Sequence, residues 1–323
     1  MYQIYDDWPK HAKTAYCTNL ELIEITGEID HIVFAGMGGS GAIGDLFAAI
    51  LSKSNIHVTL VKGYLLPKTV DSSTLVITTS VSGNTVETLT VLKSASKLNC
   101  HTVAFFSGGA METFCKNNSI PFRKIPQIHS PRASFVTFVY SILAVLQKII
   151  PIGTTNVNHS LLSLNQMSEK INSTNLTDTN PALSLAQWIS GIPLVYYPHG
   201  LQSAAIRLKS SLQENSKTHC IAEDVIEACH NGVVAWERDS VVQPILLQGA
   251  DDYTKTKQRF EIISQYFDEN NIPYYSINSG PGNILSKLIS LIYLFDFSTI
   301  YHAVFSGVDP SPVKSIDYIK GKI

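Results

Sequence analysis

The chain has 323 residues, of which 45% are hydrophobic and 15% charged, so it has enough apolar material for two domain cores. Its formal net charge of −2 gives no electrostatic reason to expect a nucleic-acid or anionic membrane partner, so a substrate anion must be held by local groups. The 5 cysteines are odd in number and lack metal-ligand spacing, which indicates reduced thiols and no metal site.

Near the start of the chain, residues 1–8 lack the basic and apolar regions of a signal peptide, and residues 10–26 are expected to form a helix. The most apolar long stretch is taken to be 135–150. It is too short, and too often interrupted by polar residues, to span a membrane, so we expect a buried helix there. The expected location is therefore the cytoplasm.

The first strong pattern is a glycine-rich turn between a strand and a helix. Residues 32–35 predict a strand buried on both faces, and a helical pattern follows over 42–50. Between them, residues 36–41 read GMGGSG. Glycines let the backbone come close to a ligand, and free amides at a helix start favour phosphate. Gly38, Gly39 and Ser40 are therefore candidate phosphate ligands.

Three kinds of ligand can bind at such a turn: a dinucleotide, a nucleotide held by a P-loop and a small phosphorylated molecule. Gly36, Gly38 and Gly41 fit a dinucleotide fingerprint, but the second strand, 56–61, is followed by Lys62 where a nicotinamide site needs an acidic residue. A nucleotide P-loop is excluded because no Gly-Lys-Ser/Thr follows. A small phosphorylated ligand remains, together with the alternative of a tight turn that binds nothing.

A second turn of the same kind supports the phosphate interpretation. After an apolar strand over 74–79, Ser80, Ser82 and Thr85 place three hydroxyls around a helix start, more than a helix cap needs. In a parallel sheet both turns lie at the carboxyl ends of strands, where ligands bind. A GMGGSG loop followed about forty residues later by SxSGNT resembles the sugar isomerase (SIS) domain.

Further along, residues 101–106 and a segment near 120 predict more strands, so we expect an open, mostly parallel α/β sheet. Pro131 then marks a helix start, and Arg132 lies at this positive helix end, where a lone cation is not stabilised. Either an anion binds beside Arg132, or Arg132 is a surface residue paired with a carboxylate.

The second half repeats the first in outline. We expect an N-terminal phosphate-binding domain over 1–150, a polar crossover over 151–180 and a second doubly wound domain over 181–323. Strands are predicted over 192–197 and 242–248. The turns after them lack the glycine cluster and the hydroxyls, so we expect phosphate binding in the first copy alone.

Two candidate acid–base residues follow in the second half. Glu214 lies at the end of an amphipathic helix over 201–212, off its apolar stripe, where the helix dipole opposes a carboxylate. The alternative is a solvated Glu214 paired with Lys217. His230 precedes Asn-Gly in a predicted turn and can titrate near neutral pH, although a plain loop histidine is the alternative.

Together these residues form the pattern RxK…ENxK…ExxHN, which is similar to the bifunctional phosphoglucose/phosphomannose isomerase family. It is carried by Arg207, Lys209, Glu214, Asn215, Lys217, Glu227, His230 and Asn231. The tail resembles the closing segment of the family, whose lysine near the end joins the active site. Lys320 is the matching residue and Lys322 the rival; the alternative is a frayed basic terminus.

The resemblance implies two SIS domains and an aldose–ketose isomerase of six-carbon sugar phosphates that needs no metal or redox cofactor. In the family the glutamate, matched by Glu214, shuttles a proton, and the histidine, matched by His230, comes from the partner subunit of a homodimer. Arg132 matches the arginine that steadies the enediolate. Two positions depart from the family pattern, Val81 for an aromatic residue and Ile226 for proline, which leaves the sugar preference open.

Two other functions are compatible with parts of the pattern. A sugar-phosphate sensor would keep the two loops without needing Arg132, Glu214 and His230, but all three are present and no DNA-binding segment accompanies them. An isomerase of amino sugar phosphates would normally carry a glutamine-hydrolysing domain, which this sequence does not show.

Overall fold

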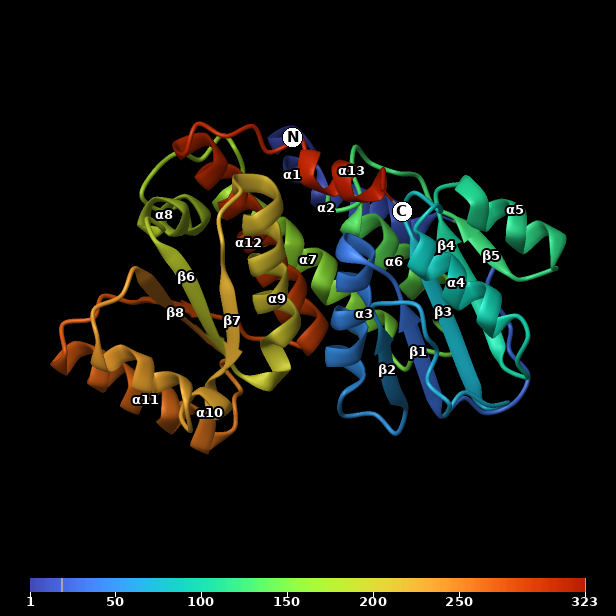
Figure 1. Ribbon diagram of the computed structural model, residues 1–323, viewed down its shortest axis with the longest axis horizontal. Coiled ribbons are helices and arrows are strands. Elements are labelled where there is room, and N and C mark those ends of the chain that lie inside the picture. Colours follow the sequence, from blue (N-terminus) through green and yellow to red (C-terminus); the bar gives the residue numbers. More distant parts are fainter. Residues whose placement is uncertain (19, 323) are drawn as a thin grey trace. The chain divides into compact units, whose positions relative to one another are not determined.

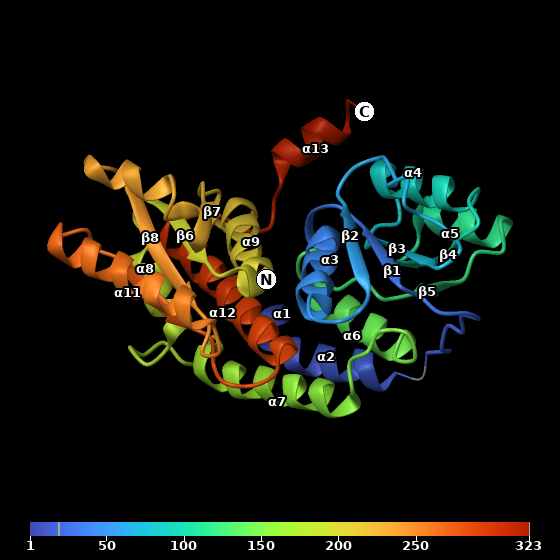
Figure 2. The same cartoon turned by 90° about the horizontal axis from the view of Figure 1, so that it is seen from below.

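The computed structural model describes residues 1–18 and 20–322, which divide into two compact units (Figures 1 and 2). The leading unit comprises residues 7–162 with 284–286. The trailing unit comprises 1–6, 163–283 and 287–322.

The leading unit is built on a five-stranded parallel sheet with the order β2-β1-β3-β4-β5. Its strands are β1 (His31–Ala35), β2 (His57–Val61), β3 (Thr74–Ser80), β4 (His101–Phe106) and β5 (Phe122–Lys124). All residues of β1 and β3 are buried, as expected for central strands covered on both faces. The central pair is in register from His31 opposite Thr74 to Ala35 opposite Thr78, so the two strands end side by side.

Helices cover both faces of this sheet. The helices of this unit are α2 (Trp8–Cys17), α3 (Gly38–Leu51), α4 (Val86–Ala95), α5 (Gly109–Asn117), α6 (Phe135–Val145) and α7 (Thr154–Ile171), which continues into the trailing unit. On one face, Phe34 of β1 stacks on Phe47 of α3 with ring centroids 5.1 Å apart. On the other face, Val33 and Val76 pack with Val91 of α4. The alternation of neighbouring β1 residues between the faces follows from strand geometry.

The trailing unit repeats this topology. Its parallel sheet has the order β7-β6-β8-β9, formed by β6 (Ile192–Tyr197), β7 (Ile221–Asp224), β8 (Val242–Gln248) and β9 (Tyr275–Asn278). The first four strands of the leading unit have the corresponding order, β2-β1-β3-β4. The expected fold class, two doubly wound α/β domains with mostly parallel sheets, is therefore confirmed.

The helical elements of the trailing unit include two long helices, over 254–269 and 284–305, that the sequence analysis did not anticipate. The set is α1 (Tyr2–Asp6), α8 (Pro181–Trp188), η1 (His199–Leu201), α9 (Gln202–Ser211), η2 (Leu212–Ser216), α10 (Val225–Ala228), η3 (Gly232–Glu237), α11 (Thr254–Glu269), α12 (Ile284–Phe305) and α13 (Lys314–Lys320). One apolar cluster of this unit joins Tyr196 of β6, Leu246 of β8 and Phe260 of α11.

Helix α12 corrects the expectation that 135–150 is the most membrane-like stretch. Among the described residues, α12 is the helix long and apolar enough to cross a membrane, but 83% of its most apolar window is buried inside the protein. It is held by Tyr293, whose hydroxyl donates to the Tyr5 carbonyl at 2.7 Å, and by Tyr301, whose hydroxyl donates to the Ile171 carbonyl at 3.0 Å. Figure 2 shows α12 passing beside α1. The expected buried helix does form over Phe135–Val145.

Two helix boundaries also differ from expectation. The predicted helix over 10–26 is wrong at both ends, because α2 begins at Trp8, where Pro9 suits the first turn, and ends at Cys17. The polar crossover expected over 151–180 contains the 18-residue helix α7.

A buried histidine at the start of β1 makes stability depend on pH. The His31 ring is 2.9 Å from Thr59 Oγ1 through Nε2 and 3.3 Å from Thr74 Oγ1 through Nδ1. Burial lowers the pKa of His31 below its ordinary 6.5, and the nearby His57, whose ring centroid is 5.0 Å away, lowers it further. The unfolded chain therefore binds this proton more readily than the folded chain does, and stability falls as the pH drops through 6.5.

A His31→Gln variant, which cannot titrate, should lose less stability than the wild type between about pH 7.5 and about pH 5.5. Urea unfolding at a series of pH values measures this difference. His101→Gln, at the first residue of β4, is the matched control and should keep the wild-type pH dependence. Parallel stability curves for wild type and His31→Gln would contradict the assignment.

Candidate active site

The two predicted phosphate loops lie next to each other in the leading unit. β1 leads into the glycine turn before α3, and β3 leads into the hydroxyl turn before α4. Ala35 and Thr78 are neighbours in the sheet, so both turns leave it at the same edge. The amide of Val81 donates to Ser40 Oγ at 3.2 Å, and this bond ties one turn to the other. Gly38, Gly39 and Ser40 thus lie beside the hydroxyl turn.

The hydroxyl turn is fixed by its own side chains. Ser80 Oγ and Thr85 Oγ1 are 2.9 Å apart, and Ser80 Oγ accepts the Gly83 amide at 3.1 Å. Ser82 is exposed, and its hydroxyl accepts the Asn84 amide at 3.2 Å. Three hydroxyls therefore lie around one turn, as the spacing predicts.

The two helices that begin at these turns have no side-chain cap. Met37 precedes α3 and Thr85 precedes α4, and neither side chain accepts a hydrogen bond from the first turn of its helix. The first amides of a helix lack intrahelical acceptors and need a partner from elsewhere. An anion bound at the turns would accept these hydrogen bonds and would interact favourably with both helix dipoles.

Arg132 packs against the glycine turn. A Cβ on Gly39 would lie 3.2 Å from the Arg132 amide nitrogen and from the carbonyl carbon of Pro131, so the segment before α6 approaches the start of α3 closely. Arg132 is 5% exposed. Burial does not fit a surface position for Arg132, and its backbone lies beside the predicted phosphate site.

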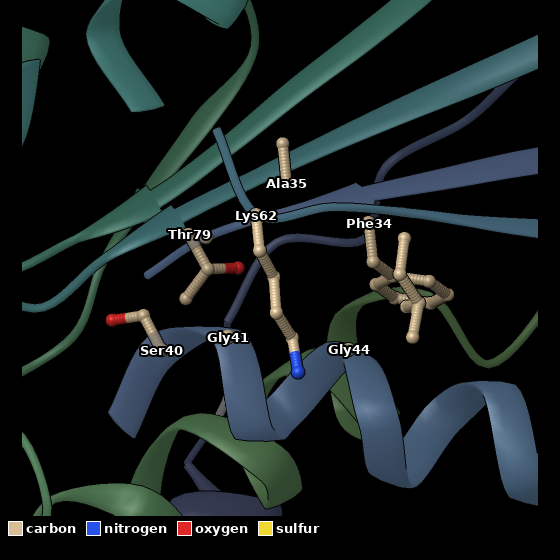
Figure 3. Close-up of a pocket in the computed structure, with 9 residues that line it drawn as sticks. Phe34, Ala35, Ser40, Gly41, Gly44, Lys62 and Thr79 are labelled. Atoms are coloured by element: carbon tan, nitrogen blue, oxygen red, sulfur yellow. The ribbon is translucent and has the colours of Figure 1, made fainter. Parts of the chain in front are cut away.

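Lys62 directly follows β2 and forms an ion pair within the leading unit. Its amine donates to both carboxylate oxygens of Asp45 at 2.6 Å. Figure 3 shows the Lys62 side chain crossing the start of α3 near Gly41, with its amine toward the helix. The pair joins β2 to α3 behind the glycine turn, and sequence reasoning did not find it. A cation where a nicotinamide site needs an acid supports the rejection of the dinucleotide interpretation.

In the trailing unit, Glu214 lies in a π-helical turn, Leu212–Ser216, that continues α9. The side chain of Glu214 is half-buried. Lys217, in the left-handed conformation with φ 57°, ends the turn, and its amine donates to the Glu214 carbonyl at 2.7 Å and to the Asp309 carbonyl at 3.2 Å. Lys217 thus holds the backbone of the turn and links it to the C-terminal segment. Such π turns are rare in proteins, and those that occur often lie at functional sites.

His230 lies in an exposed turn after α10. Next to it, the Asn231 amide group donates to Glu227 Oε1 at 3.0 Å, which fixes the turn. Glu214 precedes β7 and His230 follows it, so within one chain the two lie at opposite edges of the trailing sheet. The structure therefore does not bring Glu214 and His230 of the same chain together.

The two candidate lysines of the tail lie in or just after α13. Lys320 is the last residue of this helix and is exposed. Lys322 follows, with its amine 5.7 Å from the centroid of the Tyr318 ring. The Lys217–Asp309 bond brings the start of the tail to the edge of the unit that carries Glu214.

Known proteins resemble the chain over its whole length. The sequence model of the SIS domain matches residues 27–150, and that of the "Bacterial phospho-glucose isomerase C-terminal SIS domain" matches 178–323. A bifunctional phosphoglucose/phosphomannose isomerase of Pyrobaculum calidifontis is 31% identical over 96% of this chain and 93% of its own, and one of Caldicellulosiruptor bescii is 28% identical over 100% and 98%. This chain belongs to the bifunctional phosphoglucose/phosphomannose isomerase family.

The fold comparison agrees with the family. The C-terminal domain of glucosamine-fructose-6-phosphate aminotransferase from Francisella tularensis superposes with a TM-score of 0.71 over 96% of this chain and 98% of its own, at 15% identity. At this identity the similarity shows the fold alone. The fold of this family member, two parallel-sheet α/β domains, thus also occurs in that protein.

In the second SIS domain of this isomerase family member, a carboxylate of the chain itself lies in the turn that follows β8. At the end of β8, the Gly249 amide donates to Asp252 Oδ2 at 2.7 Å, and the Lys287 amine bonds to Asp251. Burial raises the pKa of Asp252, while the Gly249 amide acts in the opposite direction. A carboxylate therefore lies where the first domain has its hydroxyl turn, which supports phosphate binding in the first copy alone.

The described residues give little support for a metal site or a reactive cysteine. Among residues 1–18 and 20–322, no three His, Cys, Asp or Glu side chains gather as a metal site would require. All five cysteines are free, and burial raises the pKa of Cys115 to about 11, which keeps that thiol protonated and unreactive.

Proposed function

We infer that this protein is an aldose–ketose isomerase that interconverts glucose 6-phosphate and mannose 6-phosphate with fructose 6-phosphate through a cis-enediolate. Two observations support this function. Relatives with the name bifunctional phosphoglucose/phosphomannose isomerase match the chain from end to end. The pair of uncapped helix starts, joined by the Ser40–Val81 hydrogen bond, is suited to one phosphate ester.

The ester would be held by backbone amides and hydroxyls of the leading unit. We assign this role to Gly38, Gly39, Ser40, Ser80, Ser82 and Thr85. Amides and hydroxyls donate hydrogen bonds to phosphate oxygens without adding a formal charge, which agrees with the small net charge of the chain. Their geometry is fixed before the ligand binds, so little conformational entropy would be lost on binding.

The chemistry needs a base for a proton on carbon and a cation for the developing oxyanion. We assign the base to Glu214, which moves the proton between C2 and C1, and the cation to Arg132, which stabilises the enediolate. Mannose 6-phosphate and glucose 6-phosphate share one enediolate. Either sugar therefore forms according to the face of C2 that receives the proton.

Ring opening needs a second acid–base pair, for which we propose His230 and Lys320. His230 is exposed in a fixed turn and is available to a neighbouring molecule. Lys320 is preferred over Lys322, because the amine of Lys322 already lies over an aromatic ring. We propose no metal or redox cofactor, since proton transfers alone complete the isomerisation.

A coupled assay that starts from fructose 6-phosphate and follows glucose 6-phosphate and mannose 6-phosphate separately tests the function. We expect both products. A purified, folded protein that binds fructose 6-phosphate and forms neither product would favour the sensor. The sequence also suits a cytoplasmic protein, and we propose that location.

We propose that the protein is a homodimer in which His230 completes the site of the partner. The positions of Glu214 before β7 and of His230 after it, at opposite ends of this strand, support this arrangement. Mixing inactive Glu214→Gln and His230→Ala proteins after dissociation should restore activity, since half of the dimers formed would be mixed and each would contain one intact site. Random exchange should give about a quarter of the wild-type activity.

Two control mixtures accompany this complementation. Each variant re-associated with itself should stay inactive, and size-exclusion chromatography should show dimers in every sample. Dimers that remain inactive after exchange, shown to be mixed by differently tagged chains, would mean that each chain supplies its own histidine.

A further inference from the structure

A buried ion pair lies between the helix that carries Glu214 and helix α12. Arg207 of α9 and Asp296 of α12 have side chains 2% and 0% exposed. Arg207 Nε donates to Asp296 Oδ1 at 2.9 Å, and Nη2 donates to Oδ2 at 2.5 Å. Taking two charges out of water is costly, and apolar residues of similar volume would often fill such a place with equal or greater stability. The pair therefore calls for a role besides packing.

Hydrogen bonds connect this pair to both sides of the Glu214 turn. Before Glu214, Ser211 Oγ donates to Asp296 Oδ1 at 2.5 Å. After Glu214, the Asn215 side-chain amide donates to Thr299 Oγ1 at 2.8 Å, and Thr299 Oγ1 donates to the Asp296 carbonyl at 2.7 Å. The residue before the π-helical turn and a residue within it are thus both attached to one turn of α12.

The charge of Glu214 also reaches the guanidinium of Arg207. Burial opposes its charge, but the charge and hydrogen bonds of Asp296 outweigh this effect and raise the pKa of Arg207; Tyr5 and Glu214 contribute in the same direction. Glu214 is therefore within electrostatic range of a guanidinium that Asp296 already occupies. Without Asp296, the guanidinium would lose this partner while the Glu214 carboxylate stays in range.

We propose that Arg207 and Asp296 are positioning residues for Glu214. Asp296 engages the guanidinium and anchors Ser211, and through Thr299 the same turn of α12 anchors Asn215, so that the Glu214 carboxylate stays directed at substrate. This inference rests on the proposed function, because it assigns a reason for the position of the proposed base.

The first test is Asp296→Asn, which keeps the side-chain shape and removes the charge. We expect kcat to fall about 10-fold or more, with KM for fructose 6-phosphate within about twofold of wild type, because ester binding uses other groups. The double variant R207Q/D296N removes the guanidinium as well. Its kcat should lie several-fold above that of Asp296→Asn when both variants are assayed well below their melting temperatures, where a recovery of stability alone would leave kcat unchanged.

Thr299→Val tests the second anchor and serves where Asp296→Asn does not fold. It removes the acceptor for Asn215, and we expect kcat to fall about threefold or more at constant KM. Ser298→Ala is the matched control: its hydroxyl is equally buried on α12 but donates to the Leu294 carbonyl, outside the network. Ser298→Ala should therefore keep the wild-type kcat. Equal kcat values for Thr299→Val and Ser298→Ala would overturn the proposal.

Three further outcomes separate the inference from the proposed function. Wild-type protein without isomerase activity would refute the function and with it this inference. Active wild type, inactive Glu214→Gln and a fully active Asp296→Asn would refute the inference alone. Equal losses of kcat in Asp296→Asn and in R207Q/D296N, each matched by a lower melting temperature, would also refute it.

Discussion

Glu214→Gln should lower kcat by about 10²–10⁴-fold or more, because the amide cannot accept the proton from carbon. Affinity for fructose 6-phosphate should change little, since the ester ligands proposed here lie in the leading unit and the glutamine has the same shape. Steady-state kinetics of both sugar products give kcat, and isothermal titration with fructose 6-phosphate gives the dissociation constant.

Glu261→Gln is the matched control, because it makes the same chemical change at an exposed position of α11. It should behave as wild type in both measurements. Near-normal turnover by Glu214→Gln would remove this residue from the mechanism, and a lost affinity with unchanged kcat would assign it to binding instead.

Gly83→Ala should destabilise the leading unit by about 3 kcal/mol or more. Gly83 has φ +67°, and a Cβ there would lie 1.7 Å from the Gly108 carbonyl oxygen and 2.7 Å from its carbon. Both atoms belong to the backbone, so no rotamer change relieves the clash. The hydroxyl turn must then move, and the Gly83 amide would lose its bond to Ser80 Oγ. Calorimetry should show a lower melting temperature, and titration a weaker affinity for fructose 6-phosphate.

Gly63→Ala provides the comparison for this substitution. No heavy atom lies within 4 Å of the added Cβ, and the residue is not in the left-handed region. Its melting temperature and affinity should match those of wild type. A Gly83→Ala protein as stable as Gly63→Ala would show that the turn adapts and that its close contact with Gly108 is not required.

The leading sheet could be predicted from sequence because its central strands are short apolar runs that end in glycine or hydroxyl turns. Strands β1 and β3 have this form, and both lie as expected. β7 was missed because it is 4 residues long, exposed at Ile221 and acidic at Glu223 and Asp224. Helix α12 was missed for a different reason. Its apolar residues lie on all sides, so it lacks the single apolar stripe by which a surface helix is recognised in a sequence.

In the site, too, some features could be predicted from nearby sequence and others depend on residues far apart in the chain. The phosphate turns are local in sequence, so spacing alone predicts Ser40, Ser80 and Thr85 as ligands. Glu214 is predicted from its place at a helix end together with the pattern that resembles the isomerase family. Its anchor was not found, because Arg207 and Asp296 are 89 positions apart and nothing in the local pattern joins them. The domain boundaries and the roles of the site residues stay predictions.

The carboxylate that Asp252 brings to the Gly249 amide has a thermodynamic consequence for the duplicated architecture. In the trailing copy the negative group is covalently part of the chain, so the favourable energy of that contact belongs to folding and is present at every metabolite level. In the leading copy, where we propose that substrate binds, the corresponding energy would be added only when substrate arrives. The same topology would then carry both a built-in counterion and an exchangeable one, and the supply of sugar phosphate would affect the stability of one half of the molecule.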